Sequence, residues 1–270
     1  MTAPFDFAPL LAPGTPAPAA KWNGFPKYNF IGGHNDAGNV PVQALIDAAT
    51  SVLTREGATL ATYGLNSGPL GYKPLREFLA AKLKDHAGIE CASDEILITS
   101  GSMQGLDLIN SLLVTKGDTV IIEQETYGGA LTKLNKLGAN VIGIPLDGEG
   151  LRLDVLKQKL EELKQKGIKP KYIYTIPTVQ NPTGAIMGEA RRAELLKIAA
   201  EYGVMIFEDE CYSDLIWTGK RPKSLYAMAK GEGVIFIGSF SKSIAPALRV
   251  GYIVAKWDIL GRILGLKQDA

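Results

Sequence analysis

The stretch Val234-Ile-Phe-Ile-Gly-Ser-Phe-Ser-Lys-Ser-Ile-Ala-Pro-Ala-Leu-Arg-Val-Gly-Tyr252 joins an apolar run to a loop that is rich in polar side chains. The apolar run predicts a buried strand, because continuous apolar residues suit a sheet that is covered on both faces. In the loop, Lys242 lies between two serines and seven residues before Arg249. Hydroxyls, an amine and a guanidinium at the end of a buried strand would suit a small anionic ligand, which the lysine could also bind covalently.

Two other interpretations of Lys242 stay open on this stretch alone. A lysine in a serine-rich loop is usually a solvated surface charge. The segment Ser239-Phe-Ser-Lys242 also fits the Ser-x-x-Lys motif of penicillin-binding proteins and class A β-lactamases. Those proteins also need Ser-Asp-Asn and Lys-Thr-Gly elements, and neither tripeptide occurs in the sequence, so the serine-acylase interpretation is disfavoured.

Apolar runs like the one before Lys242 recur along the chain from about residue 95 onward. They alternate with longer amphipathic segments, and this alternation predicts an α/β fold with a mainly parallel, seven-stranded sheet between helices. The predicted strands are Ile96–Thr99, Thr119–Glu123, Asn140–Ile144, Tyr172–Ile176, Val204–Glu208, Val234–Ile237 and Val250–Val254. The predicted helices are Met103–Val114, Gly129–Leu137, Leu153–Lys166 and Glu189–Tyr202, the last with Gly203 as a stop.

Composition and the ends of the sequence exclude several classes of function. With 29 basic and 28 acidic residues, the chain has no net charge that would favour nucleic acid or an anionic membrane as a partner. Cys91 and Cys211 have no metal-ligand spacing and are too few for a disulfide framework, so we expect no metal and a reducing compartment. The Ala- and Pro-rich residues 1–21 predict an extended arm and no secretory signal, and no apolar run reaches membrane-spanning length. These features predict a soluble, cytoplasmic protein.

Two further polar segments follow predicted strands. Thr99-Ser-Gly-Ser-Met-Gln-Gly105 opens a helix, and its small residues leave backbone N–H groups free to bind a phosphate, although such turns are often only geometry. Gln180-Asn-Pro-Thr-Gly184 places Asn181 before a proline, which keeps it out of the helical region and lets its amide face a ligand. A plain turn would have the same sequence.

Two more candidates lie at strand ends. Asp209, in Glu208-Asp-Glu-Cys-Tyr212, could cap a helix or pair with a protonated ring nitrogen of a cofactor. Tyr127, in Glu123-Gln-Glu-Thr-Tyr-Gly128, could stack on a ring or simply pack in the core.

In this order, the five segments resemble the sequence pattern of the class I/II aminotransferases, the fold-type I enzymes that use pyridoxal phosphate. Tyr63-Gly-Leu-Asn-Ser-Gly-Pro-Leu-Gly-Tyr-Lys-Pro-Leu-Arg-Glu77 also resembles a stretch of that family. The resemblance covers roughly residues 25–260 and is closest to the aromatic and α-aminoadipate (kynurenine-type) branch. It implies the fold-type I large domain and the exchange of an amino group between an amino acid and a 2-oxo acid, on pyridoxal 5′-phosphate.

The resemblance also implies a role for each site residue. Lys242 would bind the cofactor as a Schiff base and move the substrate proton, Asp209 would pair with the pyridinium nitrogen, and Tyr127 would stack on the ring. Asn181 and Tyr212 would hydrogen-bond the 3-oxygen of the ring. The phosphate would be bound by Ser102, the Met103 backbone, Ser239, Ser241 and Arg249, and Gln104 would also belong to the cofactor-binding residues.

Other implied roles concern the substrate and a second subunit. Gly33 and Asn181 would line the substrate pocket, whereas His34 is interpreted as a loop residue. Tyr63 would reach the phosphate from the neighbouring subunit, which implies a homodimer.

The sequence departs from the family pattern at its end. Family members continue into a C-terminal small domain, which carries the arginine that binds the substrate carboxylate, and no residue before Ala270 inherits that role. The expected organisation is an N-terminal arm and first helix (1–60), a large cofactor-binding domain (61–255) and the start of an interdomain helix (256–270), with the small domain absent. A fragment of a longer chain and a natural short form both fit, and the fragment is favoured.

Three functions are compatible with these residues. The leading prediction is an aminotransferase for aromatic or α-aminoadipate-like amino acids. A pyridoxal-phosphate β-lyase or synthase would share the same residues. A non-catalytic cofactor-binding protein is the third, but the short arm cannot supply the winged-helix domain of the regulators that contain such a unit.

Overall fold

The computed structural model describes residues 5–12, 15, 17–29 and 31–269 of the 270. Contacts divide the chain into two units, Met1–Gly33 and His34–Ala270, and each is described by itself. In the described part of the first unit, Ala8–Leu10 form a short 3₁₀ helix and the remaining residues form no helix or strand.

The second unit is built on a seven-stranded sheet in the order β1-β9-β8-β7-β6-β2-β3. All neighbouring pairs are parallel except those of β9, which runs antiparallel to both β1 and β8. The predicted fold class, a mainly parallel seven-stranded sheet between helices, is confirmed. The strands are β1 (Ile96–Ser100), β2 (Thr119–Glu123), β3 (Asn140–Ile144), β6 (Tyr172–Thr175), β7 (Met205–Asp209), β8 (Val234–Ser239) and β9 (Val250–Val254). A separate small hairpin pairs β4 (Leu146–Asp147) with β5 (Gly150–Leu151).

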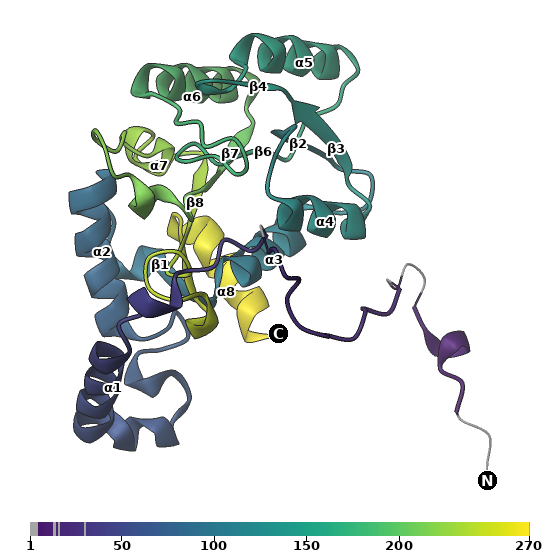
Figure 1. Ribbon diagram of the computed structural model, residues 1–270. Helices are drawn as coiled ribbons and strands as arrows, with labels where there is room; N and C mark the ends of the chain where they lie inside the picture. The colour runs from purple at the N-terminus through teal and green to yellow at the C-terminus, as the bar shows by residue number, and fades with distance from the viewer. Residues whose placement is uncertain (1–4, 13–14, 16, 30, 270) are drawn as a thin grey trace. The chain divides into compact units, whose positions relative to one another are not determined.

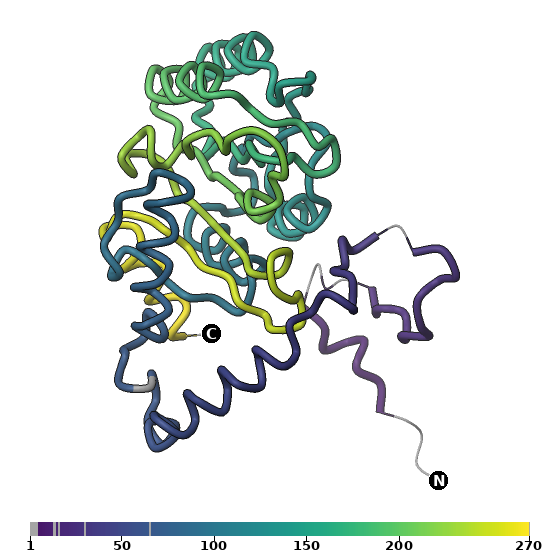
Figure 2. Tube along the Cα trace, turned by 60° about the vertical axis from the view of Figure 1, so that its left-hand side comes forward, coloured from purple at the N-terminus to yellow at the C-terminus, as the bar shows by residue number. Residues whose placement is uncertain are grey.

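Helices cover both faces of the sheet and form two apolar clusters with it (Figure 1). One cluster joins the sheet to α2 (Lys73–Ala87), α5 (Leu153–Gln165), α6 (Glu189–Tyr202) and the short α7 (Leu225–Met228). The other joins it to α3 (Ser102–Leu113), α4 (Gly128–Leu137) and α8 (Trp257–Gln268). Figure 2 shows the C-terminal segment, in yellow, beside blue segments from much earlier in the chain, and these contacts are those of β9 with β1 and of α8 with α3.

The strand β3 and the helix α1 are less buried than the rest of the second unit. The prediction that every strand is covered on both faces is wrong for β3, an edge strand whose first four residues are exposed or half-buried. α1 (Val42–Glu56) has no buried residue, although its sequence is amphipathic. Among the helices of the described residues, none combines the length and apolar character that crossing a bilayer requires.

Candidate active site

The strand register brings the candidate residues to one edge of the sheet. Asp209 at the end of β7 pairs with Ile237, and Ser239 at the end of β8 pairs with Gly251. Ser100 at the end of β1 pairs with Val250, which is the first residue of β9. Because β9 runs opposite to its neighbours, its start lies at the same edge as their carboxyl ends, which is where ligands bind in open α/β sheets.

A cup for an anion forms where β1, β8 and β9 meet. The guanidinium of Arg249 lies directly against Gly101, so that a Cβ at position 101 would approach Arg249 Cζ to 2.8 Å. Gly251 packs equally closely, since a Cβ there would lie 2.6 Å from the backbone nitrogen of Ser102. Ser102 begins α3, whose first backbone N–H groups have no acceptor within the helix. A guanidinium beside a helix N-terminus is a favourable arrangement for a phosphate.

Hydrogen bonds fix the groups around this cup. Arg249 has a left-handed backbone (φ 53°), and its guanidinium donates a hydrogen bond to the carbonyl of Pro246 at 3.1 Å. The hydroxyl oxygen of Ser239 accepts a hydrogen bond from the backbone N–H of Ser241 at 3.1 Å. The side chain of Gln104 accepts a hydrogen bond from the backbone N–H of Ser100 at 2.8 Å, which ties the first turn of α3 to the end of β1.

The close packing of Gly101 against Arg249 leads us to a prediction for the variant Gly101→Ala. Gly101 has a φ of 76°, which alanine adopts only with strain, and the added methyl group would displace the Arg249 guanidinium. We expect the affinity for pyridoxal phosphate, and for inorganic phosphate as a simpler probe, to fall at least about tenfold, as for the loss of a charge-assisted hydrogen bond. Titration calorimetry measures both, with Gly117→Ala as a control, because Gly117 also has a positive φ but no atom near its Cβ position. Equal losses in the two variants would contradict the assignment of the cup.

Asp209 is a buried carboxylate, only 4% exposed, at the end of β7. It accepts hydrogen bonds from the Tyr174 hydroxyl at 2.6 Å and from the backbone N–H of Cys211 at 3.3 Å. Burial raises the pKa of the Asp209 carboxyl, although these hydrogen bonds lower it. Among the described lysines and arginines, none forms an ion pair with Asp209. A buried anion of this kind is suited to pairing with a cationic group of a ligand.

Lys242 lies in the loop between β8 and β9, half-buried, with its Nζ 5.6 Å from the centroid of the Tyr212 ring. Burial lowers the pKa of the Lys242 amine, while the nearby Cys211 thiol raises it. The sequence predicts a lowered pKa for a lysine that lies near cationic groups and out of bulk water, and desolvation is the cause found in the structure. A larger share of neutral amine favours nucleophilic attack on an aldehyde.

Aromatic and amide groups lie close to Lys242 and Asp209. The amide nitrogen of Asn181 donates to the Tyr212 hydroxyl at 3.3 Å, so the two residues predicted to share a ring oxygen lie within contact of each other. The Tyr127 hydroxyl donates to the sulfur of Met103 at 3.2 Å. The Tyr127 ring also packs so closely over Gly129 that a Cβ there would lie 2.6 Å from it.

Tyr63 and Gly33 were also predicted to belong to the site. Tyr63, in a 3₁₀ helix (Tyr63–Asn66), is fully exposed. Gly33 belongs to the first unit, so its predicted place in a substrate pocket stays a prediction.

Sequence reasoning missed three residues that support the site. Tyr174 donates a hydrogen bond to Asp209, and the register of β6 and β7 brings the two together, since Tyr174 pairs with Phe207 and Asp209 lies on the same face as Phe207. The Cys211 thiol lies close enough to Ser102 and Asp209 for both to affect its pKa. Glu123, which is 1% exposed, accepts hydrogen bonds from Thr175 and other groups at the end of β6. No local sequence signal identifies Glu123.

Because Glu123 is buried, we expect the free energy of unfolding of the protein to depend on pH. Burial raises the pKa of the Glu123 carboxyl from 4.5 to about 7. A group whose pKa is raised on folding contributes stability that is complete below pH 4.5 and is lost as pH rises through about 7. Relative to Glu123→Gln, the wild type should therefore lose on the order of 3 kcal/mol of unfolding free energy between these pH values. Urea denaturation at several pH values measures the difference, and parallel curves for the two proteins would contradict the prediction.

The family model of aminotransferase class I and II matches residues 29–268. The chain belongs to this family. It is 37% identical to an aromatic-amino-acid aminotransferase of Thermococcus litoralis over 229 residues, which are 85% of this chain and 54% of the relative.

Two solved aminotransferases have closely similar structures. The kynurenine aminotransferase of Pyrococcus horikoshii, in complex with PMP, has a TM-score of 0.82 and 37% identity, with 88% of this chain and 58% of that one covered. The α-aminoadipate aminotransferase of Thermus thermophilus, complexed with N-(5′-phosphopyridoxyl)-L-leucine, has a TM-score of 0.79 and 34% identity, with 89% and 59% covered. The chain thus spans a little more than half the length of these relatives.

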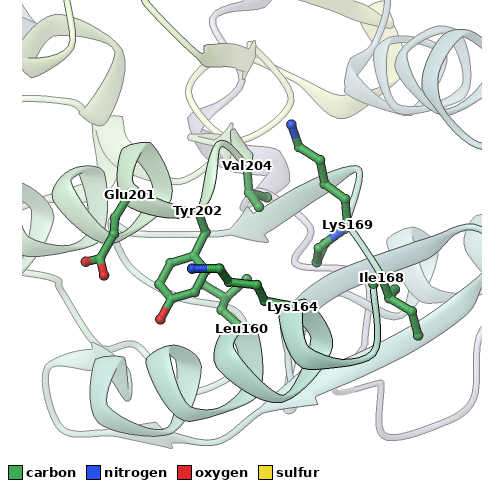
Figure 3. A pocket seen from close by; sticks show the side chains of 9 residues that line it. Leu160, Lys164, Ile168, Lys169, Glu201, Tyr202 and Val204 are labelled. Carbon is green, nitrogen blue, oxygen red and sulfur yellow. The ribbon is translucent and has the colours of Figure 1, made fainter.

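A surface cavity of about 260 Å³ lies at the opposite edge of the sheet (Figure 3). It is lined by Val204, directly before β7, and by Pro170, shortly before β6. Tyr202 and Lys164 line it side by side, with the lysine Nζ 5.7 Å from the ring centroid. None of the candidate cofactor residues contributes to this cavity.

Proposed function

We propose that the protein is an aminotransferase that uses pyridoxal 5′-phosphate to move an amino group between an amino acid and a 2-oxo acid. The observation that carries the proposal is the meeting, at one edge of the sheet, of three chemically different groups. They are the Gly101–Arg249 cup, the buried anion of Asp209 and the half-buried amine of Lys242. The ligands of the two solved relatives, PMP and N-(5′-phosphopyridoxyl)-L-leucine, support this cofactor.

The residues present fit pyridoxal phosphate group by group. The cup and the serines Ser102, Ser239 and Ser241 would hold the phosphate, with the backbone of Met103 and Gln104 in the first turn of α3. Asp209 would keep the ring nitrogen of the cofactor protonated. To do so, the Asp209 carboxyl, whose pKa is raised, has to be ionised in the complex. Asn181 and Tyr212 would bind the 3-oxygen, and Tyr127 would lie against the ring face. When bound, pyridoxal phosphate supplies an electron sink for the bond at the substrate Cα that breaks.

The other proposed roles in the reaction belong to Lys242, Asn181 and Tyr212. Lys242 Nζ would hold the cofactor covalently through its aldehyde carbon and, once released by the substrate amine, would take the proton from the substrate Cα and deliver it to the cofactor carbon C4′. Its lowered pKa favours the neutral amine that both tasks need. The hydrogen bond between Asn181 and Tyr212 would keep their polar groups directed to one place.

We also propose the substrates of the protein, its assembly and its location in the cell. Aromatic or α-aminoadipate-like amino acids are supported by the descriptions of the relatives. A cytoplasmic homodimer is proposed, in which the exposed Tyr63 of one subunit would reach the phosphate of the other. Residues 61–255 would form the large cofactor domain, with 1–60 as arm and first helix and 256–270 as the start of an interdomain helix.

A product analysis tests the proposal. The protein, incubated with pyridoxal phosphate, an aromatic or α-aminoadipate amino acid and a 2-oxo acid, should release the matching 2-oxo acid over many turnovers only when both substrates are present. Release of ammonia and pyruvate from a cysteine conjugate, without transfer to the added 2-oxo acid, would instead support a β-lyase. Chromatographic quantification of both product sets distinguishes the two reactions.

A further inference from the structure

Glu123 and Gln180 form a buried pair beside the candidate site. Glu123, at the end of β2, accepts hydrogen bonds from the Thr175 hydroxyl at 2.5 Å, from the Ile176 backbone N–H at 3.0 Å and from the Gln180 amide at 2.9 Å. The two side chains are 1% and 2% exposed. A surface role is therefore excluded for both, and their hydrogen bonds are made away from water, where an unmade bond costs most.

The orientation of the Gln180 amide is fixed by its other partners. Its oxygen accepts from the backbone N–H of Thr183 at 2.9 Å and from the Thr183 hydroxyl at 2.8 Å. Its nitrogen donates to Glu123 and, at 2.6 Å, to the backbone carbonyl of Glu125. A flipped amide would place nitrogen against an N–H donor and oxygen against a carbonyl, so only one orientation satisfies all four partners.

These bonds connect the two loops that carry the ring-facing residues. Glu125 lies two residues before Tyr127, and Gln180 directly precedes Asn181. The loop of Asn181 is closed by further bonds from Gly184 N–H to the Gln180 carbonyl at 2.6 Å and from Gln180 N–H to the Ala185 carbonyl at 2.9 Å. The pair therefore spans β2, β6 and both loops at once.

We propose that Glu123 and Gln180 act as a positioning pair, which sets the distance between the loops of Tyr127 and Asn181 and thereby the affinity for the cofactor ring. This inference rests on the proposed function. Neither residue needs to touch the cofactor, because they act through the loops that they join. Of the described hydrogen bonds, none joins the side chain of Glu123 to the candidate cofactor residues, although the charge of Asp209 lies near enough to contribute to the raised pKa of Glu123.

Glu123→Gln tests the pair with almost no change in volume. The new amide can still accept from Thr175 and Ile176, but its nitrogen then faces the Gln180 nitrogen, donor against donor, and Gln180 cannot flip without losing both bonds from Thr183. We expect amide hydrogen exchange at Thr183–Ala185 to be at least about tenfold faster and the dissociation constant for pyridoxal phosphate to be about tenfold higher.

Tyr172→Phe is the matched control. It removes a buried hydrogen bond, from the Tyr172 hydroxyl to Asn110 at 2.5 Å, on the same strand, β6, but in a part that does not touch either loop. It should lower the urea midpoint of the cofactor-free protein and leave both the exchange at Thr183–Ala185 and the cofactor affinity unchanged.

The outcomes separate the inference from the proposed function. Unchanged exchange and affinity in Glu123→Gln, or equal losses of affinity in both variants, would overturn the positioning role. If the wild type binds no pyridoxal phosphate, the proposed function fails, and so does the part of the inference that concerns affinity. The exchange measurement on the cofactor-free protein would then still decide whether the pair fixes the loop of Asn181.

Discussion

Lys242→Ala should abolish covalent attachment of pyridoxal phosphate and slow transamination at least about 10³-fold, the range expected for loss of a positioned proton-transfer group. The half-buried amine, with a pKa lowered by burial, is the nucleophile that the site offers to the cofactor aldehyde. The phosphate cup and Asp209 remain in the variant, so the cofactor should still bind, but without the covalent link. Visible absorbance and a spin-column assay of retained cofactor measure the two effects separately.

Lys220→Ala is the control for this variant. Lys220 is an exposed lysine in the loop after Tyr212, and its removal should leave the bound cofactor and the rate unchanged. Retention of the lysine-linked absorbance band in Lys242→Ala would show that another lysine binds the aldehyde.

Asp209→Asn should have opposite effects on cofactor binding and on the stability of the cofactor-free protein. Burial raises the pKa of Asp209, so folding disfavours its charged form, and the neutral amide should raise the melting temperature without cofactor. The charge-assisted hydrogen bond to the pyridinium nitrogen would be lost, which corresponds to about 1.5–3 kcal/mol, or roughly a 10- to 150-fold weaker binding of pyridoxal phosphate. Scanning calorimetry and a cofactor titration give the two numbers.

Glu208→Gln provides the matched control. Glu208 is the preceding residue of β7, is also fully buried and also has a raised pKa, chiefly from burial. Its carboxylate binds the backbone N–H groups of Leu225 and Tyr226, away from the candidate site. The control should leave cofactor affinity unchanged, and weaker binding in both variants to the same degree would contradict the role of Asp209.

Much of the fold could be predicted from the sequence because the strands are continuous apolar runs. The predicted strand Thr119–Glu123 and the predicted helix Glu189–Tyr202 have the bounds that the structure shows, since each lies between clear polar or glycine boundaries. The antiparallel course of β9 could not be predicted, because its pairing with β1 joins residues about 150 positions apart. The exposure of β3, at one edge of the sheet, could not be predicted either, because local sequence does not report strand order.

The candidate site was predictable where one residue combines a reactive side chain with a strand end, as at Lys242 and Asp209. The contacts that support the site could not be predicted from the sequence. The packing of Arg249 against Gly101 joins segments that are far apart in sequence, and the Glu123–Gln180 pair depends on the parallel neighbours β2 and β6.

The most direct test of the central claim is chemical mapping of the cofactor on the wild-type protein. The protein is saturated with pyridoxal phosphate, reduced with borohydride, digested and examined by mass spectrometry. We expect one phosphopyridoxyl group per chain, on Lys242. Modification spread over several exposed lysines, or none at all, would contradict the claim that this edge of the sheet is a cofactor site.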